Sequence, residues 1–223
     1  MKKTLLFIGL IAGFSIYAQN PTVLNDQFLS QAKSSGGDAA SAAWINKSIA
    51  DQGETGSLVL PNTSIKFDDN ESDGMYQEIA VLQNTSYKLT YLYQFKDGGL
   101  GGTEPSELEI RILKGSGYTS GYSVVYYTTV VSVPQDEFGY TNITDVENSA
   151  NNLASHSLVA PIDQEWYTGE LTFNSGTETS IAIFGRGTGR PTTVSADTKA
   201  NQYAWSNGKH EIRIDYLSLT NES

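Results

Sequence analysis

The chain has 223 residues, no cysteine and a formal net charge of −11, from 14 basic and 25 acidic side chains. This negative charge makes nucleic acid and anionic membranes poor partners, whereas neutral sugars and divalent cations remain suitable ones. The absence of cysteine excludes disulfide bonds. Its 13 tyrosines, 21 glycines and 2 methionines are typical of strands joined by polar turns.

The first residues have the pattern of a secretory signal peptide. Two lysines precede an apolar run at 5–12, and Ala18 stands at the expected cleavage position. The run is shorter than the roughly 20 residues that a membrane span needs, which disfavours the alternative of a retained anchor. We therefore predict a signal peptide at 1–18 and one secreted, extracellular domain at 19–223. Without a cysteine, the chain cannot carry the lipid-linked residue of a lipoprotein.

Short strand-like runs, bounded by Gly, Pro or Asn, recur through the rest of the chain. They lie at 22–28, 57–60, 64–67, 75–82, 87–95, 107–113, 122–133, 166–173, 179–184 and 211–219. Helical periodicity is weak and confined to 38–49, and 142–163 is predicted as a polar crossover. The pattern favours an all-β fold, a single β-sandwich or jelly roll of about ten antiparallel strands.

Period-two alternation sorts the strand side chains into two faces. It places Gln77, Ile79 and Val81 on the core side of their strand, as it does the alternate apolar residues of 87–95 and 107–113. The opposite positions are predicted to share one polar sheet face, with these members: Tyr76, Glu78, Gln94, Glu109, Arg111 and Trp166. Such a face suits sugars, because flat rings stack on pyranoses while polar groups pair with hydroxyls. An ordinary solvated face is the alternative.

Further candidate ligand residues fall between the predicted strands. Trp44, Tyr203 and Trp205 lie in polar segments, where a large aromatic either caps the core or forms an exposed platform. Arg186 and Arg190 lie in a Gly-rich loop and either bind acidic or sulfated sugars or pair with structural acids. No helix is predicted after these glycines, so the loop does not fit a dinucleotide site.

The last strand changes phase partway along. Apolar residues of 211–219 occupy even positions as far as Ile214 and odd positions from Leu217. A strand that keeps one face inward therefore needs a bulge at Asp215-Tyr216. A bulge at an acid can direct its carboxylate towards an ion or a neighbouring loop.

Three motifs resemble those of secreted carbohydrate-binding modules of families 4, 9, 16 and 22. Gln77-Glu78-Ile79 is similar to their Gln-x-hydrophobic strand, 87–91 to their Tyr-x-Leu-x-aromatic strand, and 215–219 to their closing Asp-Asp-Val-Ser-Leu. The resemblance spans about 23–219. It implies a galactose-binding-like jelly roll that binds polysaccharide on a concave sheet face.

The same resemblance implies a structural calcium ion (Ca2+) between the first strand and the last. Asp215 matches the first acid of the closing motif, and Asn25 and Gln27 on the first strand supply further oxygen ligands. Tyr216 replaces the second acid of that motif, and Gln27 stands where the families commonly have glutamate. The predicted calcium ligands are thus Asn25, Gln27 and Asp215.

Motifs for catalysis are missing. His156 and His210 have no motif partner, and neither the Glu-x-Asp-x-x-Glu strand of sandwich glycosidases nor the Gln-x-His strand of jelly-roll alginate lyases is present. We therefore predict a non-catalytic polysaccharide-binding protein with no catalytic residue, no membrane insertion and no nucleic-acid partner. The alternatives are a lyase acting on an acidic glycan through His156, a tyrosine and Arg111, or a structural, adhesin-like sandwich. Whether the glycan is neutral or acidic, and the oligomeric state, stay open.

Overall fold

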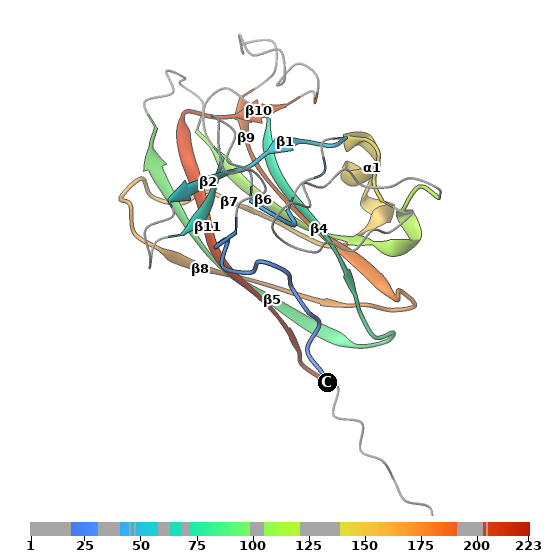
Figure 1. The fold of residues 1–223 in the computed structure, drawn as a ribbon. Coiled ribbons are helices and arrows are strands. Elements are labelled where there is room, and N and C mark those ends of the chain that lie inside the picture. Colours follow the sequence, from blue (N-terminus) through green and yellow to red (C-terminus); the bar gives the residue numbers. More distant parts are fainter. Residues whose placement is uncertain are drawn as a thin grey trace, which may run out of the picture.

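The computed structural model describes most of the chain after residue 18. The described residues are 19–30, 41–44, 46, 48–57, 63–67, 72–98, 105–120, 139–190, 203 and 205–223. They form two β-sheets packed face to face (Figure 1), so the predicted all-β sandwich is confirmed. The predicted signal peptide at 1–18 and strand at 122–133 lie outside them. No helix in this described part is long and apolar enough to cross a membrane.

The first sheet has six described strands. Five follow the order β1, β4, β9, β6, β7, and β10 pairs with β9. Their bounds are β1 Asp51–Gln52, β4 Asp73–Ala80, β6 Glu107–Lys114, β7 Asn152–Leu158, β9 Ser180–Arg190 and β10 Ser206–Asn207. All pairs are antiparallel except β1 with β4.

The second sheet has five described strands in the order β2, β3, β11, β5, β8, all antiparallel. Their bounds are β2 Glu54–Ser57, β3 Ser64–Phe67, β5 Ser86–Asp97, β8 Tyr167–Asn174 and β11 His210–Asn221. Among the described residues between β6 and β7, three short helical turns occur: η1 Gly115–Gly117, α1 Ile143–Glu147 and η2 Ser149–Asn151. The prediction of a strandless crossover at 142–163 is therefore wrong, since this stretch contains α1, η2 and β7.

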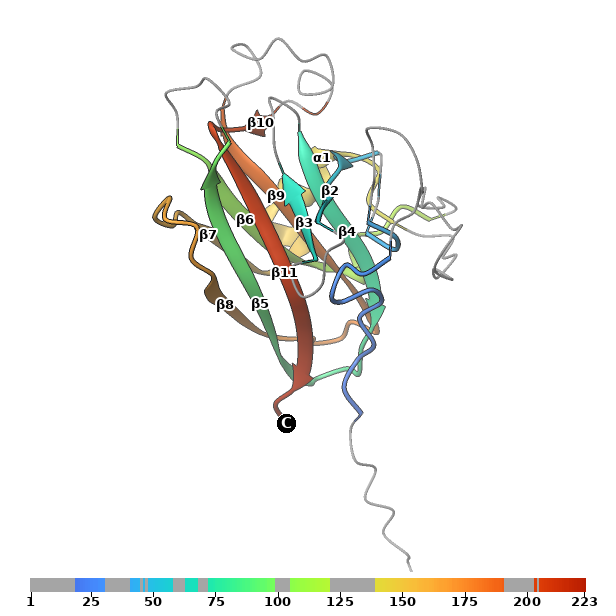
Figure 2. The ribbon, with the colours of Figure 1, turned by 60° about the vertical axis from the view of Figure 1, so that its left-hand side comes forward.

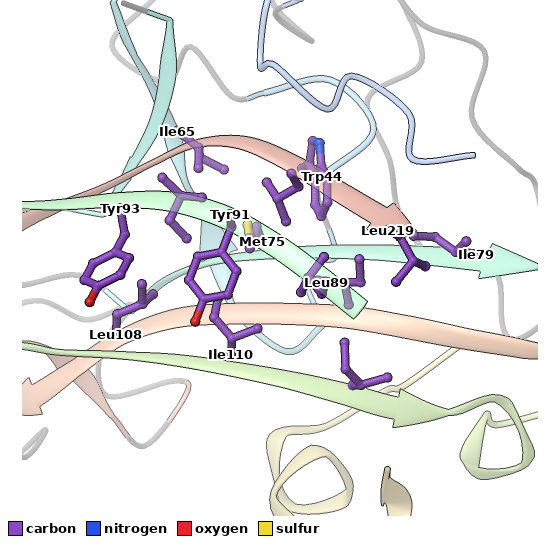
Figure 3. Packing of buried hydrophobic residues seen from close by; sticks show 14 of the residues in the cluster. Trp44, Ile65, Met75, Ile79, Leu89, Tyr91, Tyr93, Leu108, Ile110 and Leu219 are labelled. Atoms are coloured by element: carbon purple, nitrogen blue, oxygen red, sulfur yellow. The ribbon is translucent and has the colours of Figure 1, made fainter. Parts of the chain in front are cut away.

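The core between the sheets follows the predicted alternation. The odd residues of β5, from Tyr87 to Phe95, are buried, and they face the even residues Leu108, Ile110 and Ile112 of β6. Figure 3 shows the Tyr91 and Tyr93 rings extending from β5 towards Ile110 and Leu108. These large rings fill the space between the two sheets, and burial of so much apolar surface is the main stabilising term.

The predicted bulge in the last strand is confirmed. The β11 ladder with β5 shifts register between Asp215 and Leu217. Tyr216 takes a positive φ of 30° at the bulge, and its side chain is 38% exposed. This extra residue lets Ile214 and Leu217 both reach the core, as the phase change in the sequence requires.

The N-terminal segment is not the strand that the sequence predicts at 22–28. Instead, the buried side chain of Gln77 on β4 takes the place of a strand partner. Its Oε1 accepts from the Leu24 N–H at 2.8 Å, and its Nε2 donates to the Leu24 carbonyl at 2.9 Å. Nε2 also donates to the Ala43 carbonyl at 3.2 Å, so one amide holds two loop segments against the sandwich. The described part of 38–49 likewise contains no helix.

Replacing Gly169 by alanine should destabilise the sandwich. A Cβ at Gly169 on β8 would lie 2.3 Å from Cζ of the fully buried Tyr91 ring. We expect Gly169→Ala to lower the free energy of unfolding by about 1–3 kcal/mol, measured by urea denaturation. Thr172→Val, at an exposed position of the same strand, is the control and should change it by less than ~0.5 kcal/mol. Equal midpoints for the two variants would show that the Tyr91 ring moves aside freely.

Candidate functional site

Most of the predicted ligand residues gather on the outer face of the first sheet. Glu109 on β6 faces Arg186 on β9, and Arg111 faces Phe184 in the next row. Tyr76 on β4 faces Phe184 from the other side. Arg186 and Arg190, predicted in a loop, are residues of strand β9. The ladder register thus brings charged groups of β6 and β9 together beside Tyr76 of β4.

Three of these side chains, Glu109, Arg111 and Arg186, form an arginine–glutamate cluster with Glu147 of α1. The Glu109 carboxylate accepts from both guanidinium groups, and Arg186 Nη2 also donates to Glu147 Oε1 at 2.9 Å. The Arg186 guanidinium lies 5.0 Å from the centre of the Trp205 ring, a cation–π contact. Two positive charges therefore meet two negative ones, and the cluster carries no net charge.

The outer face is covered rather than open. Arg186 is 6% exposed and Trp205 7% exposed. Tyr76, Tyr203 and Trp205 belong to a second apolar cluster on this face, with the following members: Ile49, Ala50, Tyr76, Leu113, Tyr140, Val146, Ala182, Phe184, Tyr203 and Trp205. Figures 1 and 2 show α1 lying over this side of the sheet. The prediction of one solvent-facing aromatic and polar face is therefore wrong for the first sheet. Glu78 is buried beneath the same cover, bonded by the Tyr76 hydroxyl at 2.7 Å.

Trp44 also lies in the interior. Its ring is fully buried, 5.5 Å from the Phe28 ring, and its Nε1 donates to the Asn25 carbonyl at 3.0 Å. Of the two alternatives for Trp44, core capping or an exposed platform, the structure shows core capping. Trp44 contributes no surface for a ligand.

Gln94 belongs to β5 of the second sheet and Trp166 immediately precedes β8, so neither lies on the face that holds Glu109 and Arg186. The β5–β8 ladder ends at the pair Tyr93 and Tyr167, and Gln94 and Trp166 are the next residues beyond this pair. Trp166 is 37% exposed, whereas the other two tryptophans are buried. It ends the β7–β8 loop, residues 159–166, which projects in gold from the left side in Figures 1 and 2. Val159 and Ile162 of this loop are also exposed.

Hydrogen bonds fix the β7–β8 loop in one conformation. Asp163 accepts from the Glu165 N–H at 3.0 Å and from the Tyr167 hydroxyl at 2.6 Å. The Gln94 amide donates to the carbonyl of Gln164, whose φ of 64° is unusual for a residue other than glycine. The Tyr167 hydroxyl holds the pKa of Asp163 below its ordinary value of 3.8, and Asp163 in turn raises the pKa of Tyr167 to about 12. The loop is therefore a preformed platform with an ionised carboxylate.

The three groups of the lyase alternative are only partly assembled. The Tyr91 hydroxyl lies 3.4 Å from His156 Nδ1, and burial raises the pKa of this tyrosine above its ordinary value of 10.0. His156 pairs with the inward-facing Ile110, while Arg111, the next residue on β6, belongs to the opposite face of the sheet. The guanidinium that would neutralise a substrate carboxylate is therefore separated from the tyrosine and histidine.

The predicted calcium ligands lie near one another in the chain fold but do not form a ligand set. The Asp26 carbonyl accepts from the Leu217 N–H at 2.8 Å, which places the N-terminal segment beside the β11 bulge. Asn25, however, uses its amide to close its own loop, accepting from Ser30 N–H and donating to the Ser30 and Ala42 carbonyls. Asp215 Oδ1 accepts from the Tyr216 N–H.

Two further observations bear on this calcium site. Burial raises the pKa of Asp215. No group of three or more acidic, histidine or cysteine side chains that could hold a metal occurs among the described residues. Of the three predicted ligands only Asp215 is a carboxylate, and calcium stays a prediction.

No family model matches the chain, and no curated protein matches it in sequence. Several solved structures are similar to it over most of its length. A carbohydrate-binding module of family 4 has a TM-score of 0.46 and 10% identity, covering 90% of this chain and 100% of that one. TmCBM61 in complex with β-1,4-galactotriose has a TM-score of 0.43 and 14% identity, covering 92% and 100%. The CBM22-1 xylan-binding domain from Paenibacillus barcinonensis Xyn10C has a TM-score of 0.41 and 10% identity, covering 86% and 90%.

These three structures are carbohydrate-binding modules, the class that the sequence resembles. At such low identities and TM-scores, however, the function has to be argued from the residues of this chain.

Removing Glu109 should destabilise the fold strongly, because both arginines that it pairs are enclosed. We expect Glu109→Ala to lower the free energy of unfolding by about 3 kcal/mol. Glu170→Ala, which breaks the exposed pair of Glu170 with Lys88, is the matched control and should cost less than ~1 kcal/mol. Urea denaturation of both variants compares them, and similar losses would show that the cluster is open to water.

The β7–β8 loop should keep its structure over a wide pH range. Because the pKa of Asp163 is lowered, the stabilisation of the loop by the ionised carboxylate is complete above about pH 4. It is lost as the pH falls through the lowered pKa. Because the pKa of Tyr167 is raised, the stabilisation of the loop by its protonated hydroxyl is complete below about pH 10. It is lost as the pH rises towards 12. The Trp166 indole NMR signal should be constant between these limits. Asp163→Asn should remove the acid transition, and an unchanged transition would contradict this assignment.

Proposed function

We propose that the chain is a secreted, non-catalytic polysaccharide-binding protein whose ligand stacks on Trp166 of the β7–β8 loop. The observation that carries this proposal is the exposure of Trp166 on a loop whose backbone is fixed by hydrogen bonds. An exposed indole offers the flat apolar surface that the face of a pyranose ring covers. A preformed loop binds with a smaller loss of conformational entropy than a flexible one.

Polar groups beside Trp166 supply the remaining contacts. Gln164 and Glu165 precede it and are exposed, so their side chains can accept hydrogen bonds from sugar hydroxyls. Asp163 has its own partners within the loop and mainly holds the conformation. The ligand contacts that we assign are therefore Trp166 for stacking and Gln164 and Glu165 for hydrogen bonding.

Charge favours a neutral glycan over an acidic one. The β7–β8 loop contains two carboxylates and no basic residue, and the whole chain has a net charge of −11. Arg111 and Arg186, which suit acidic sugars as residue types, are already neutralised within the arginine–glutamate cluster. An anionic polysaccharide would thus approach a negative surface without finding a free positive group among the residues of this loop.

Two parts of the proposal rest on separate grounds. Secretion rests on the signal-peptide pattern at 1–18. The absence of catalysis is supported by the separation of Arg111 from the Tyr91–His156 pair, because a β-elimination needs all three groups around one sugar.

Replacing Trp166 should weaken polysaccharide binding strongly and leave the fold intact. We expect Trp166→Ala to weaken binding about 30-fold, which corresponds to ~2 kcal/mol for a central aromatic anchor. The measurement is affinity electrophoresis of residues 19–223 in gels containing hydroxyethylcellulose, arabinoxylan or galactan. Tyr216→Ala is the matched control, because Tyr216 is exposed to the same extent but lies at the β11 bulge. It should migrate like the unaltered protein.

The other outcomes of this experiment separate the alternatives. Retardation by carboxymethylcellulose but not by hydroxyethylcellulose would contradict a neutral ligand. New ultraviolet absorbance from unsaturated sugar products would make the protein a lyase, and no effect of any glycan would leave a structural sandwich. Thermal unfolding in CaCl2 and in EDTA tests the predicted calcium ion, whose removal should lower the melting temperature of the unaltered protein but not that of Asp215→Asn.

A further inference from the structure

A separate pocket lies at the far end of β8 from Trp166. Its volume is about 480 Å³, and it is lined by Gly115, Ser116, Tyr118, Thr177, Glu178, Thr179 and Ser180. Trp166 immediately precedes β8, whereas the turn at 175–179 follows it. At about 3.3 Å per strand residue, the two ends of β8 are roughly 25 Å apart. In Figure 1 the β7–β8 loop is at the left and the β8–β9 turn is at the lower right.

The walls of this pocket are held together by Glu178. Its two carboxylate oxygens accept from the N–H and the hydroxyl of Ser116, each at 2.8 Å, so the β8–β9 turn is tied to η1. A Cβ at Gly115 would lie 2.5 Å from the Ser180 carbonyl oxygen, so only glycine allows this close approach. The lining is therefore preformed.

The aromatic side of the pocket is also fixed. The Tyr118 hydroxyl lies 3.2 Å from Ser180 Oγ, and its ring packs edge-on against buried Tyr140 with ring centres 5.6 Å apart. The ring is half-buried, while Ser116, Thr177 and Thr179 are exposed. One wall is thus apolar and rigid, and the opposite rim is hydroxylated and accessible.

The lining chemistry suits a small ligand that carries many hydroxyl groups. Five side-chain hydroxyls line the pocket. That of Ser116 donates to Glu178 and can still accept, those of Tyr118 and Ser180 share one hydrogen bond, and those of Thr177 and Thr179 lie at the exposed rim. Glu178 adds acceptor sites, since each carboxylate oxygen has two lone pairs and only one is used by Ser116. The lining contains no basic residue, so an anion would meet an uncompensated carboxylate. The volume lies in the range of small-molecule sites.

We propose that this pocket is a second ligand site that takes one neutral sugar unit, either a free monosaccharide or the end of a glycan chain. The assignment rests on the lining residues themselves and does not depend on Trp166. With both sites occupied, the protein would hold two sugar units at opposite ends of one rigid strand. Such an arrangement could join two glycan chains, or two parts of one chain, with a gain in avidity.

NMR titration of isotope-labelled residues 19–223 tests the pocket directly. The probes are glucose, galactose, mannose and xylose, a short neutral oligosaccharide of whichever sugar binds, and glucuronic acid and glucosamine as charged counterparts. We expect one neutral sugar to shift the amide signals of 115–118 and 177–180, with a dissociation constant in the millimolar range for so few ligand atoms. Tighter binding of the oligosaccharide would identify a chain end as the ligand, and equal binding a free monosaccharide.

Three variants make the test specific. Thr179→Tyr, at an exposed position of the rim, should fill the pocket and weaken binding more than tenfold. Thr172→Tyr, exposed on β8 and outside the lining, is the matched control and should bind normally. Tyr118→Phe keeps the ring contact with Tyr140 and removes only the hydroxyl, so we expect a roughly fivefold loss.

The outcomes for the pocket and for Trp166 are separable. In Trp166→Ala the pocket shifts should persist, whereas in Thr179→Tyr the retardation by polysaccharide gels should persist. Absence of shifts at 115–118 and 177–180 with every neutral sugar would overturn the pocket. So would shifts that survive in Thr179→Tyr, or shifts caused only by glucuronic acid or only by glucosamine.

Discussion

The structure depends on one constraint: the outer face of the first sheet carries large apolar side chains that must be kept from water. Tyr76, Leu113 and Phe184 are all buried on this face. Leaving these side chains exposed would cost about 25 cal/mol for each Å² of apolar surface. The chain meets this requirement with a second layer that includes α1, Tyr140 and Trp205. A face that is covered for stability cannot also be an open cleft, and the exposed tryptophan lies on a loop instead.

The same cover determines the role of the arginines. Arg186 lies beneath it, and a buried guanidinium is tolerated only when its charge is compensated. Glu109 and Glu147 provide that compensation, and Trp205 provides the aromatic surface above it. As a residue type, arginine suits recognition of an acidic sugar, but here the guanidinium is committed to acids of its own chain. Burial thus gives Arg186 a structural role, although its sequence context suggests a ligand contact.

The properties that sequence predicted well are local ones. Period-two alternation identified the core residues of β5 and β6, and the phase change located the β11 bulge, because both depend only on strand geometry. The cover, the burial of Trp44 and the use of the Gln77 amide in place of a strand were missed, because they depend on distant segments. Some signals were nevertheless present. Apolar residues on both faces of β4 and β9 indicate two covered faces, and Asn142 followed by Asp145 is a helix-capping pattern.

The platform and the pocket are built by the same physical device. In each, a carboxylate accepts from one backbone N–H and one hydroxyl: Asp163 from Glu165 and Tyr167, and Glu178 from Ser116. Each carboxylate therefore makes two hydrogen bonds that hold its loop in place. Short rigid loops at the ends of a stiff strand need little ordering when a ligand arrives, so weak contacts with a hydroxylated surface are enough for measurable binding. A neutral, polyhydroxylated partner is the one whose recognition requires only such contacts.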